Sequence, residues 1–108
     1  MLTPEQLDWL AEQAGWKLLP RGFWYRVDGP KISGVHPSTS CDRLIADHDR
    51  WMREHRISYT IRRLSDAWGV AIWSTTEGVV MWKYEADDAD TPQAGLAEAF
   101  YHARGGPQ

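Results

Sequence analysis

Hydrophobic side chains recur at helical spacing in three segments of the chain. The first segment follows the capping residue Thr3 and ends near Gly15. The second covers residues 41–55, where apolar side chains recur every three or four positions. The third follows Thr91 and is rich in alanine. We expect three amphipathic helices, the second of them a single helix of about four turns.

Alternating or continuous apolar runs predict strands in two other parts of the chain. Trp16–Leu19 and Phe23–Val27 suggest a strand pair near the N-terminus. Residues 28–40 are rich in Gly, Pro and Ser, which predicts a long loop that opens with a turn at Asp28-Gly29-Pro30. Three further strands are expected at Ser58–Leu64, Trp68–Trp73 and Val79–Tyr84.

Two details of the later strands bear on the architecture. Trp68–Trp73 is apolar throughout, which predicts a central strand covered on both faces. Thr75–Gly78 has the residues of a hairpin turn, so the strand that follows should run antiparallel.

The order of these segments predicts the fold class. Helices alternate with groups of strands, which is typical of an α+β domain. We expect a central antiparallel sheet of about four strands with helices packed on its faces, an α-β-α sandwich. The chain has 108 residues, so residues 1–108 are expected to form a single domain.

Composition narrows the cellular setting. No apolar run approaches the ~18–20 residues that cross a membrane, and Met1–Glu5 lacks the pattern of a signal peptide. The one cysteine, Cys41, excludes an intramolecular disulfide and a cysteine-based zinc cluster. These features predict a protein of a reducing cytoplasm. The seven tryptophans are interpreted mainly as core residues, because a small chain needs large side chains to build a core.

The distribution of charge disfavours general binding to duplex nucleic acid. Lys and Arg number 12 and Asp and Glu number 15, which gives a net charge of −3. The acidic residues concentrate in residues 85–90, and no basic block stands out elsewhere. A duplex-binding domain would be expected to carry a basic patch.

Several short features together point to a known family. They are Gly15-Trp16-Lys17, Ser38-Thr39-Ser40, the Trp-rich hairpin of Gly69–Trp73 and Val79–Tyr84, and Thr91-Pro92-Gln93-Ala94. On these features, over residues 4–104, the chain resembles the phage ABA sandwich domain of small bacteriophage and prophage proteins. Its Pro20–Val35 segment is longer than the corresponding link of that family. The resemblance implies a fold and a phage context, and it carries no catalytic residues.

The acidic segment is the first candidate for partner binding. Glu85, Asp87, Asp88 and Asp90 are expected to lie on a solvated loop and could dock onto a basic surface of a host protein that otherwise holds nucleic acid. Their spacing does not match a twelve-residue calcium loop. We therefore expect no metal site there.

Trp24 and Arg26 are the second candidate. The two side chains share one face of the predicted strand. An exposed Trp beside an Arg can anchor a protein interface or stack on unpaired bases. In the alternative interpretation a helix covers this face, and the stem of Arg26 packs over the indole ring.

Catalytic and metal-binding alternatives were considered for the cysteine and the histidines. His48 and His55 lie two helical turns apart, about 10 Å, too far to bind one metal together. Cys41 with His36 or His102 could form a nucleophilic pair, but a lone Cys on an apolar stripe is typically a small core residue. No phosphate loop, serine elbow or dinucleotide fingerprint is present. The chain is expected to need no cofactor and to catalyse no reaction.

These features favour a non-enzymatic, phage- or prophage-encoded interaction protein. Its expected partner is a bacterial host protein or nucleoprotein complex, and its narrower predicted role is inhibition of a nucleic-acid-directed defence, of anti-CRISPR or anti-restriction type. One alternative is a single-stranded nucleic-acid-binding accessory protein that uses Trp24, Arg21, Arg26 and Arg62. Another is a small enzyme that uses Cys41 or His48. The apolar strand 79–84 also suggests a homodimer.

Overall fold

The computed structural model describes residues 1–28 and 31–107, and these form an α+β fold. The turn predicted at Asp28-Gly29-Pro30 falls mainly on Gly29 and Pro30, which lie outside the described residues. In chain order the elements are α1 (Pro4–Gln13), β1 (Trp16–Leu18), a 3₁₀ turn (Pro20–Gly22), β2 (Trp24–Arg26), β3 (Lys31–Ser33), a 3₁₀ turn (Pro37–Thr39), α2 (Cys41–Asp47), α3 (Asp49–Glu54), β4 (Ile57–Arg63), β5 (Trp68–Thr76), β6 (Val79–Ala89) and α4 (Pro92–Ala103).

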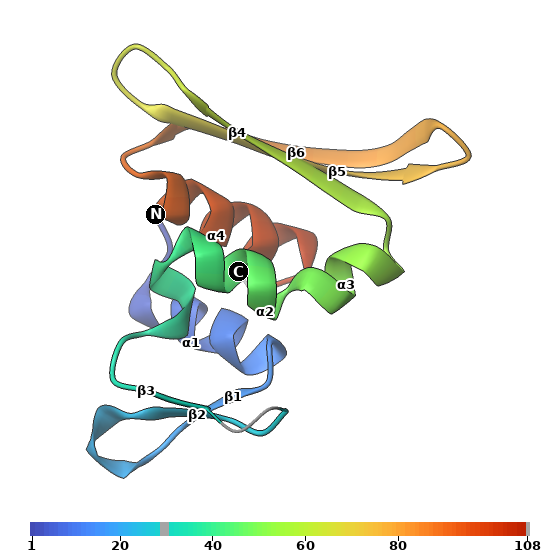
Figure 1. Cartoon of the computed structure of the whole chain (residues 1–108). Helices are drawn as coiled ribbons and strands as arrows, with labels where there is room; N and C mark the ends of the chain where they lie inside the picture. The colour runs from blue at the N-terminus through green and yellow to red at the C-terminus, as the bar shows by residue number, and fades with distance from the viewer. Residues whose placement is uncertain (29–30, 108) are drawn as a thin grey trace.

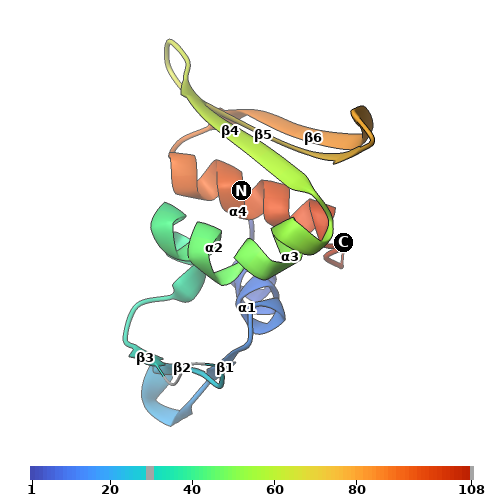
Figure 2. The same cartoon turned by 45° about the vertical axis from the view of Figure 1, so that its right-hand side comes forward.

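The strands form two separate antiparallel sheets, and the helices lie between them. The small sheet has the order β1-β2-β3 and the large sheet the order β4-β5-β6. Figure 1 shows the large sheet on one side of the helices and the small sheet on the other, and Figure 2 confirms this arrangement from a second direction. The prediction of one four-stranded sheet with helices on its faces was therefore wrong. The N-terminal strand β2 pairs with β1 and with β3, which lies in the segment expected to be a loop, and not with the later strands.

The starts of α1 and α4 were predicted correctly, since each is set by local side-chain chemistry. The backbone N–H of Gln6 donates to Thr3 Oγ1 at 3.2 Å, and Gln6 Oε1 accepts from the backbone N–H of Thr3 at 2.8 Å. This reciprocal pair is the predicted capping box of α1. Thr91 caps α4 in the same way, accepting from the backbone N–H of Ala94 at 3.2 Å.

The segment predicted as one four-turn helix is divided into α2 and α3 at His48. The backbone of His48 departs from helical geometry, with φ −101° and ψ 8°. Main-chain hydrogen bonds still connect His48 to Leu44 and Met52, each at 3.0 Å. The bend accompanies a buried His48 ring that meets Arg104. A pattern of apolar residues does not encode this bend, because the spacing on both sides of it remains helical.

The middle strand of the large sheet is covered on one face only. Val70 and Ile72 are buried against α4, whereas Ala71 and Trp73 on the opposite face are half-buried. Figure 1 shows no element packed over that second face within the described part of the chain. The prediction that both faces are covered was wrong. Because Ala71 and Trp73 on the open face are also apolar, the sequence of this strand resembles that of a strand buried on both faces.

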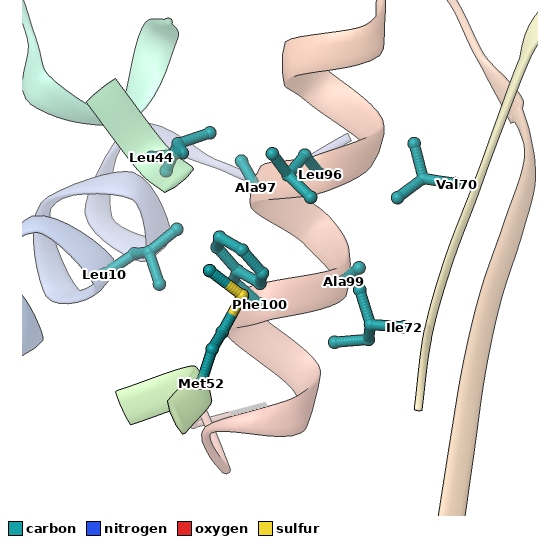
Figure 3. Close-up of a cluster of buried hydrophobic side chains, with 9 residues drawn as sticks. All are labelled: Leu10, Leu44, Met52, Val70, Ile72, Leu96, Ala97, Ala99 and Phe100. Carbon is teal, nitrogen blue, oxygen red and sulfur yellow. The ribbon is translucent and has the colours of Figure 1, made fainter. Parts of the chain in front are cut away.

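The main core is built around α4. The close-up in Figure 3 shows its side chains reaching toward the large sheet on one side and toward α1, α2 and α3 on the other. The buried members of this cluster are Leu10, Leu44, Met52, Val70, Ile72, Leu96, Ala97, Ala99 and Phe100. A second, smaller cluster, formed by Ala11, Trp16 and Trp24, joins α1 to the small sheet. The tryptophans thus serve the core only in part, since Trp82 on β6 is exposed.

Gly95 allows α4 to approach the large sheet closely. A Cβ at this position would lie 2.8 Å from Val70 Cγ2 and 3.0 Å from Ala89 Cβ. Alanine favours a helix over glycine by about 1 kcal/mol, but forcing a methyl group into a packed core typically costs about 1–3 kcal/mol. We expect Gly95→Ala to lower the free energy of unfolding by about 1 kcal/mol, measured by urea denaturation. A gain in stability would show that helix propensity outweighs packing at this position.

Candidate partner-binding site

The acidic segment predicted as a loop is the second half of strand β6. This strand continues to Ala89 because Ala86 and Ala89 turn inward and are buried, while the carboxylates between them stay exposed. The register is irregular here, since two residues of β6 (Asp87 and Asp88) lie opposite one residue of β5 (Gly69). The acidic residues were predicted to be solvent-exposed, and they are, but Glu85, Asp87 and Asp88 lie on β6 and only Asp90 follows it.

Two of the four candidate carboxylates already have cationic partners. Glu85 pairs with Lys83 on the same strand, and a hydrogen bond from Lys83 is the main cause that lowers the pKa of Glu85. Asp87 lies 3.8 Å from the guanidinium of Arg62 on β4. Asp87 Oδ1 and Arg62 Nε both lie close to Gly69 of the strand between them, where a side chain would obstruct the pair.

The remaining two carboxylates keep their charge available. Asp88 and Asp90 are exposed, and within the described residues no cation lies within 4.0 Å of either. Two of the four carboxylates predicted to dock onto a basic partner are therefore without a cationic neighbour in the described part of the chain.

Trp24 lies in the core and is not available to a partner in this structure. Its side chain is only 4% exposed, and its ring packs against the His36 ring with centroids 4.8 Å apart. The interpretation of Trp24 as an exposed anchor was wrong, and the alternative of a covered face is confirmed. The sequence alone does not decide this point, because either face of an amphipathic three-residue strand can turn inward.

Arg26 links the small sheet to α2 through a hydrogen bond and ion pair with Asp47. Its Nη1 donates to Asp47 Oδ1 at 3.2 Å, and the indole Nε1 of Trp16 donates to Asp47 Oδ2 at 2.8 Å. Both oxygens of the Asp47 carboxylate are thus occupied, and its side chain is almost fully buried. Asp47 was not among the residues singled out from the sequence. Its spacing of three from the buried Leu44 was the available signal that it faces inward.

Because Trp24 and Arg26 turn inward, their strand neighbours turn outward. Phe23, Val27 and Ile32 are 47%, 53% and 69% exposed. We call this surface the outer face of the small sheet. It is formed by Lys17, Leu19, Phe23, Tyr25, Val27 and Ile32.

The strand register makes this outer face continuous. Lys17 lies opposite Tyr25, and Tyr25 lies opposite Ile32 on the third strand. The backbone N–H of Leu19 donates to the carbonyl of Phe23 at 2.7 Å, which places these two residues side by side. Residues directly opposite each other on one face have Cβ atoms about 4.5–5.5 Å apart. The exposed apolar side chains therefore form one surface and not scattered points.

The residues of the nucleic-acid alternative are mostly engaged elsewhere. Trp24 is buried, Arg26 binds Asp47, and Arg62 pairs with Asp87. Arg21 remains exposed on the 3₁₀ turn before β2, with a positive φ of 74°. These placements leave no group of the four residues that could both stack on a base and contact a phosphate.

The catalytic alternative relied on Cys41 and a nearby histidine. His36 accepts from the backbone N–H of Ser38 at 3.1 Å through Nδ1, and its Nε2 lies 2.8 Å from Asp8 Oδ1. His102 stacks on the Tyr84 ring with centroids 5.0 Å apart. Burial, with a smaller contribution from Asp42, raises the pKa of the Cys41 thiol. A raised pKa lowers the thiolate fraction, which opposes nucleophilic use of this cysteine.

His48 is held by a group that sequence reasoning overlooked. The guanidinium of Arg104 lies 3.1 Å from His48 Nδ1, stacks over the Trp51 ring at 4.8 Å and donates to the Gln13 carbonyl at 3.3 Å. Burial first, and the charges of Arg104 and Arg26 next, lower the pKa of His48 to about 3. His48 is therefore neutral at physiological pH and accepts a hydrogen bond in the core.

A polar cleft of about 620 Å³ lies beside these residues, between the ends of α1, α2 and α4. Its wall carries both signs of charge. The charged residues that line it are Arg26, Asp28, Asp47, Asp49, Arg50, Glu54 and Arg104. The outer face of the small sheet differs from this cleft in being apolar and projecting into solvent, so it is the stronger candidate for binding a macromolecule.

Neither a metal centre nor a membrane-spanning helix is found in the part of the chain that the structure describes. In 1–28 and 31–107, no three His, Cys, Asp or Glu side chains are placed to hold a metal ion. No helix in these ranges is long and apolar enough to cross a membrane. A scan against protein-family models finds no match to this chain, and comparisons with curated proteins and with solved structures find none either.

Proposed function

We propose that this chain is a non-enzymatic binding protein that contacts a protein partner through the outer face of the small sheet. The observation that carries the proposal is the concentration of exposed apolar side chains on this face. Among the described residues twelve large apolar side chains are exposed, and four of them, Leu19, Phe23, Val27 and Ile32, lie on this face. Contiguous exposed apolar surface of this kind is typical of interaction sites.

The anchoring of the small sheet also supports this function. Arg26 and Trp16 both bind the Asp47 carboxylate, and Arg43 Nη1 donates to Ser33 Oγ at 2.6 Å. These contacts hold β1, β2 and β3 against α2. A surface fixed before binding loses less conformational entropy when it meets a partner.

In the narrower form of this proposal the partner is a bacterial host protein or nucleoprotein complex. The phage context and the anti-CRISPR or anti-restriction role are predictions from the sequence resemblance. Asp88 and Asp90, which lack a cation within 4.0 Å in the described part of the chain, would add attraction toward a basic partner.

Affinity capture from nuclease-treated bacterial lysate tests the proposal. We expect the natural chain to retain a specific protein and the Ile32→Glu variant to lose at least ~90% of it, because a charge at the centre of an apolar interface must be desolvated. Ile32 is one of the most exposed apolar residues, so this variant should fold normally, which circular dichroism would verify.

Ser65→Glu is the matched control, since Ser65 is exposed on the loop between β4 and β5. It adds the same charge away from the small sheet and should retain the partner. Equal capture by the natural chain and the Ile32→Glu variant would contradict the proposal. Capture of nucleic acid that disappears on nuclease treatment would favour the nucleic-acid-binding alternative.

A further inference from the structure

The outer edge of β6 is unpaired in the described part of the chain. β6 is an edge strand of eleven residues, since the large sheet has the order β4-β5-β6. Figure 1 shows its hairpin with β5 extending past the helices. Edge strands are normally protected by charge, twist or shortness. Here the edge begins instead with exposed apolar residues, among them Val79, Val80 and Met81.

The regular part of β6 is short and is centred on Tyr84. Trp82, Lys83, Tyr84, Glu85 and Ala86 pair one for one with β5. Register shifts interrupt the pairing on both sides of this segment, and such bulges bend a strand and end regular pairing. A new strand added at this edge would therefore find a flat ladder of five residues.

The sequence of this five-residue segment complements itself in the antiparallel direction. When two copies pair about a two-fold axis at Tyr84, Lys83 of each copy lies opposite Glu85 of the other. The four charges then alternate in sign around the axis. Trp82 lies opposite Ala86 of the other copy, so a large side chain meets a small one on the same face.

Shifting the axis along the strand removes this match. An axis at Lys83 sets two lysines opposite each other, and an axis at Glu85 does the same for two glutamates. An axis at Trp82 leaves Lys83 opposite Met81. Like charges directly opposite one another destabilise strand pairs. Of these registers, only the one centred on Tyr84 pairs every charge.

We propose that two copies of this chain associate through antiparallel pairing of Trp82–Ala86, forming one continuous six-stranded sheet. The interface is isologous, as a two-fold axis requires. It lies on the opposite side of the helices from the small sheet (Figure 1), so it is separate from the surface proposed for partner binding. Either proposal can fail without the other.

Sedimentation of the purified full chain, with charge-exchanged variants, tests this assembly. The natural chain should sediment at twice the monomer mass of 12.4 kDa. Lys83→Glu and Glu85→Lys each place like charges opposite one another in the dimer. Each variant alone should show at least a ~10-fold weaker dimer.

Mixing the two variants supplies the decisive control. Combining Lys83→Glu chains with Glu85→Lys chains again places opposite charges across the axis, so the mixture should dimerise more tightly than either variant alone. The double exchange in one chain should dimerise as well. A natural chain that is monomeric at 100 μM, single variants that dimerise normally, or a mixture that stays monomeric would each overturn the proposal.

Discussion

Lowering the pH from 7 to 4 should reduce the free energy of unfolding by roughly 3 kcal/mol through His48 alone. The His48 ring is buried between α4 and the neighbouring helices, where it contacts Phe100 with ring centroids 5.1 Å apart. Burial is the main cause of its low pKa of about 3, and the nearby charges of Arg104 and Arg26 add to it.

The free energy of unfolding falls with pH because the unfolded chain binds a proton at His48 at a higher pH than the folded chain does. The ordinary pKa of histidine is 6.5, so the unfolded chain takes up a proton as the pH falls below that value, whereas the folded chain does so only near pH 3. The contribution of His48 is complete above pH 6.5 and is lost as the pH falls toward 3. Each pH unit in that window removes about 1.4 kcal/mol.

Urea unfolding of the natural chain and of His48→Gln, measured at several pH values, would check this. Glutamine keeps an oxygen that can accept from Arg104 but does not titrate. We expect a lower stability for the variant at pH 7 and a clearly shallower decline toward pH 4. Parallel pH profiles for the two proteins would show that His48 is not the group that responds.

Phe100→Ala should lower the free energy of unfolding by about 3–5 kcal/mol, the range found when a large buried side chain is truncated to alanine. Phe100 is 0% exposed and occupies the middle of the main core in Figure 3. Its ring meets Trp51 edge-on, with centroids 5.7 Å apart. Small domains have total stabilities of roughly 5–15 kcal/mol, so this loss is a large part of the whole.

Chemical denaturation at pH 7 would measure this loss. The matched control is Phe100→Leu, which keeps most of the apolar volume and should cost distinctly less than the alanine variant. A cost below about 1 kcal/mol for Phe100→Ala would mean that the core around α4 collapses to fill the space.

The sequence predicted the features that depend on neighbouring residues. The capping box at Thr3 and the cap at Thr91 were both confirmed, because each needs only side chains three residues apart. The hairpin turn before β6 was also confirmed, with positive φ at Glu77 and Gly78. Helix caps and hairpin turns depend on residues close together in the sequence, and not on which elements pack against each other.

Features that depend on which elements meet were predicted poorly. The face of β2 that turns inward is set by the Asp47 carboxylate on α2, which accepts from both Trp16 and Arg26. The sequence of β2 alone does not indicate that Arg26 will meet Asp47. For the same reason the sequence left open whether Trp24 is exposed, although the strand pair that contains it was predicted correctly.

The acidic segment illustrates another limit of pattern reasoning. Four carboxylates in six residues suggest a loop, yet Ala86 and Ala89 provide the inward contacts that a strand needs. Alanine is a weak strand residue by propensity, and its fit here depends on the close approach of α4 at Gly95. Tertiary packing therefore overrides the local preference.

The two buried clusters are separate, and the outer face of the small sheet belongs to neither. The main core is shared by the helices and the large sheet, whereas Trp16 and Trp24 belong to the other cluster. Under the proposed function, substitutions on the outer face would change which partner is bound and leave the main core intact, as in antigen-binding loops carried on a framework.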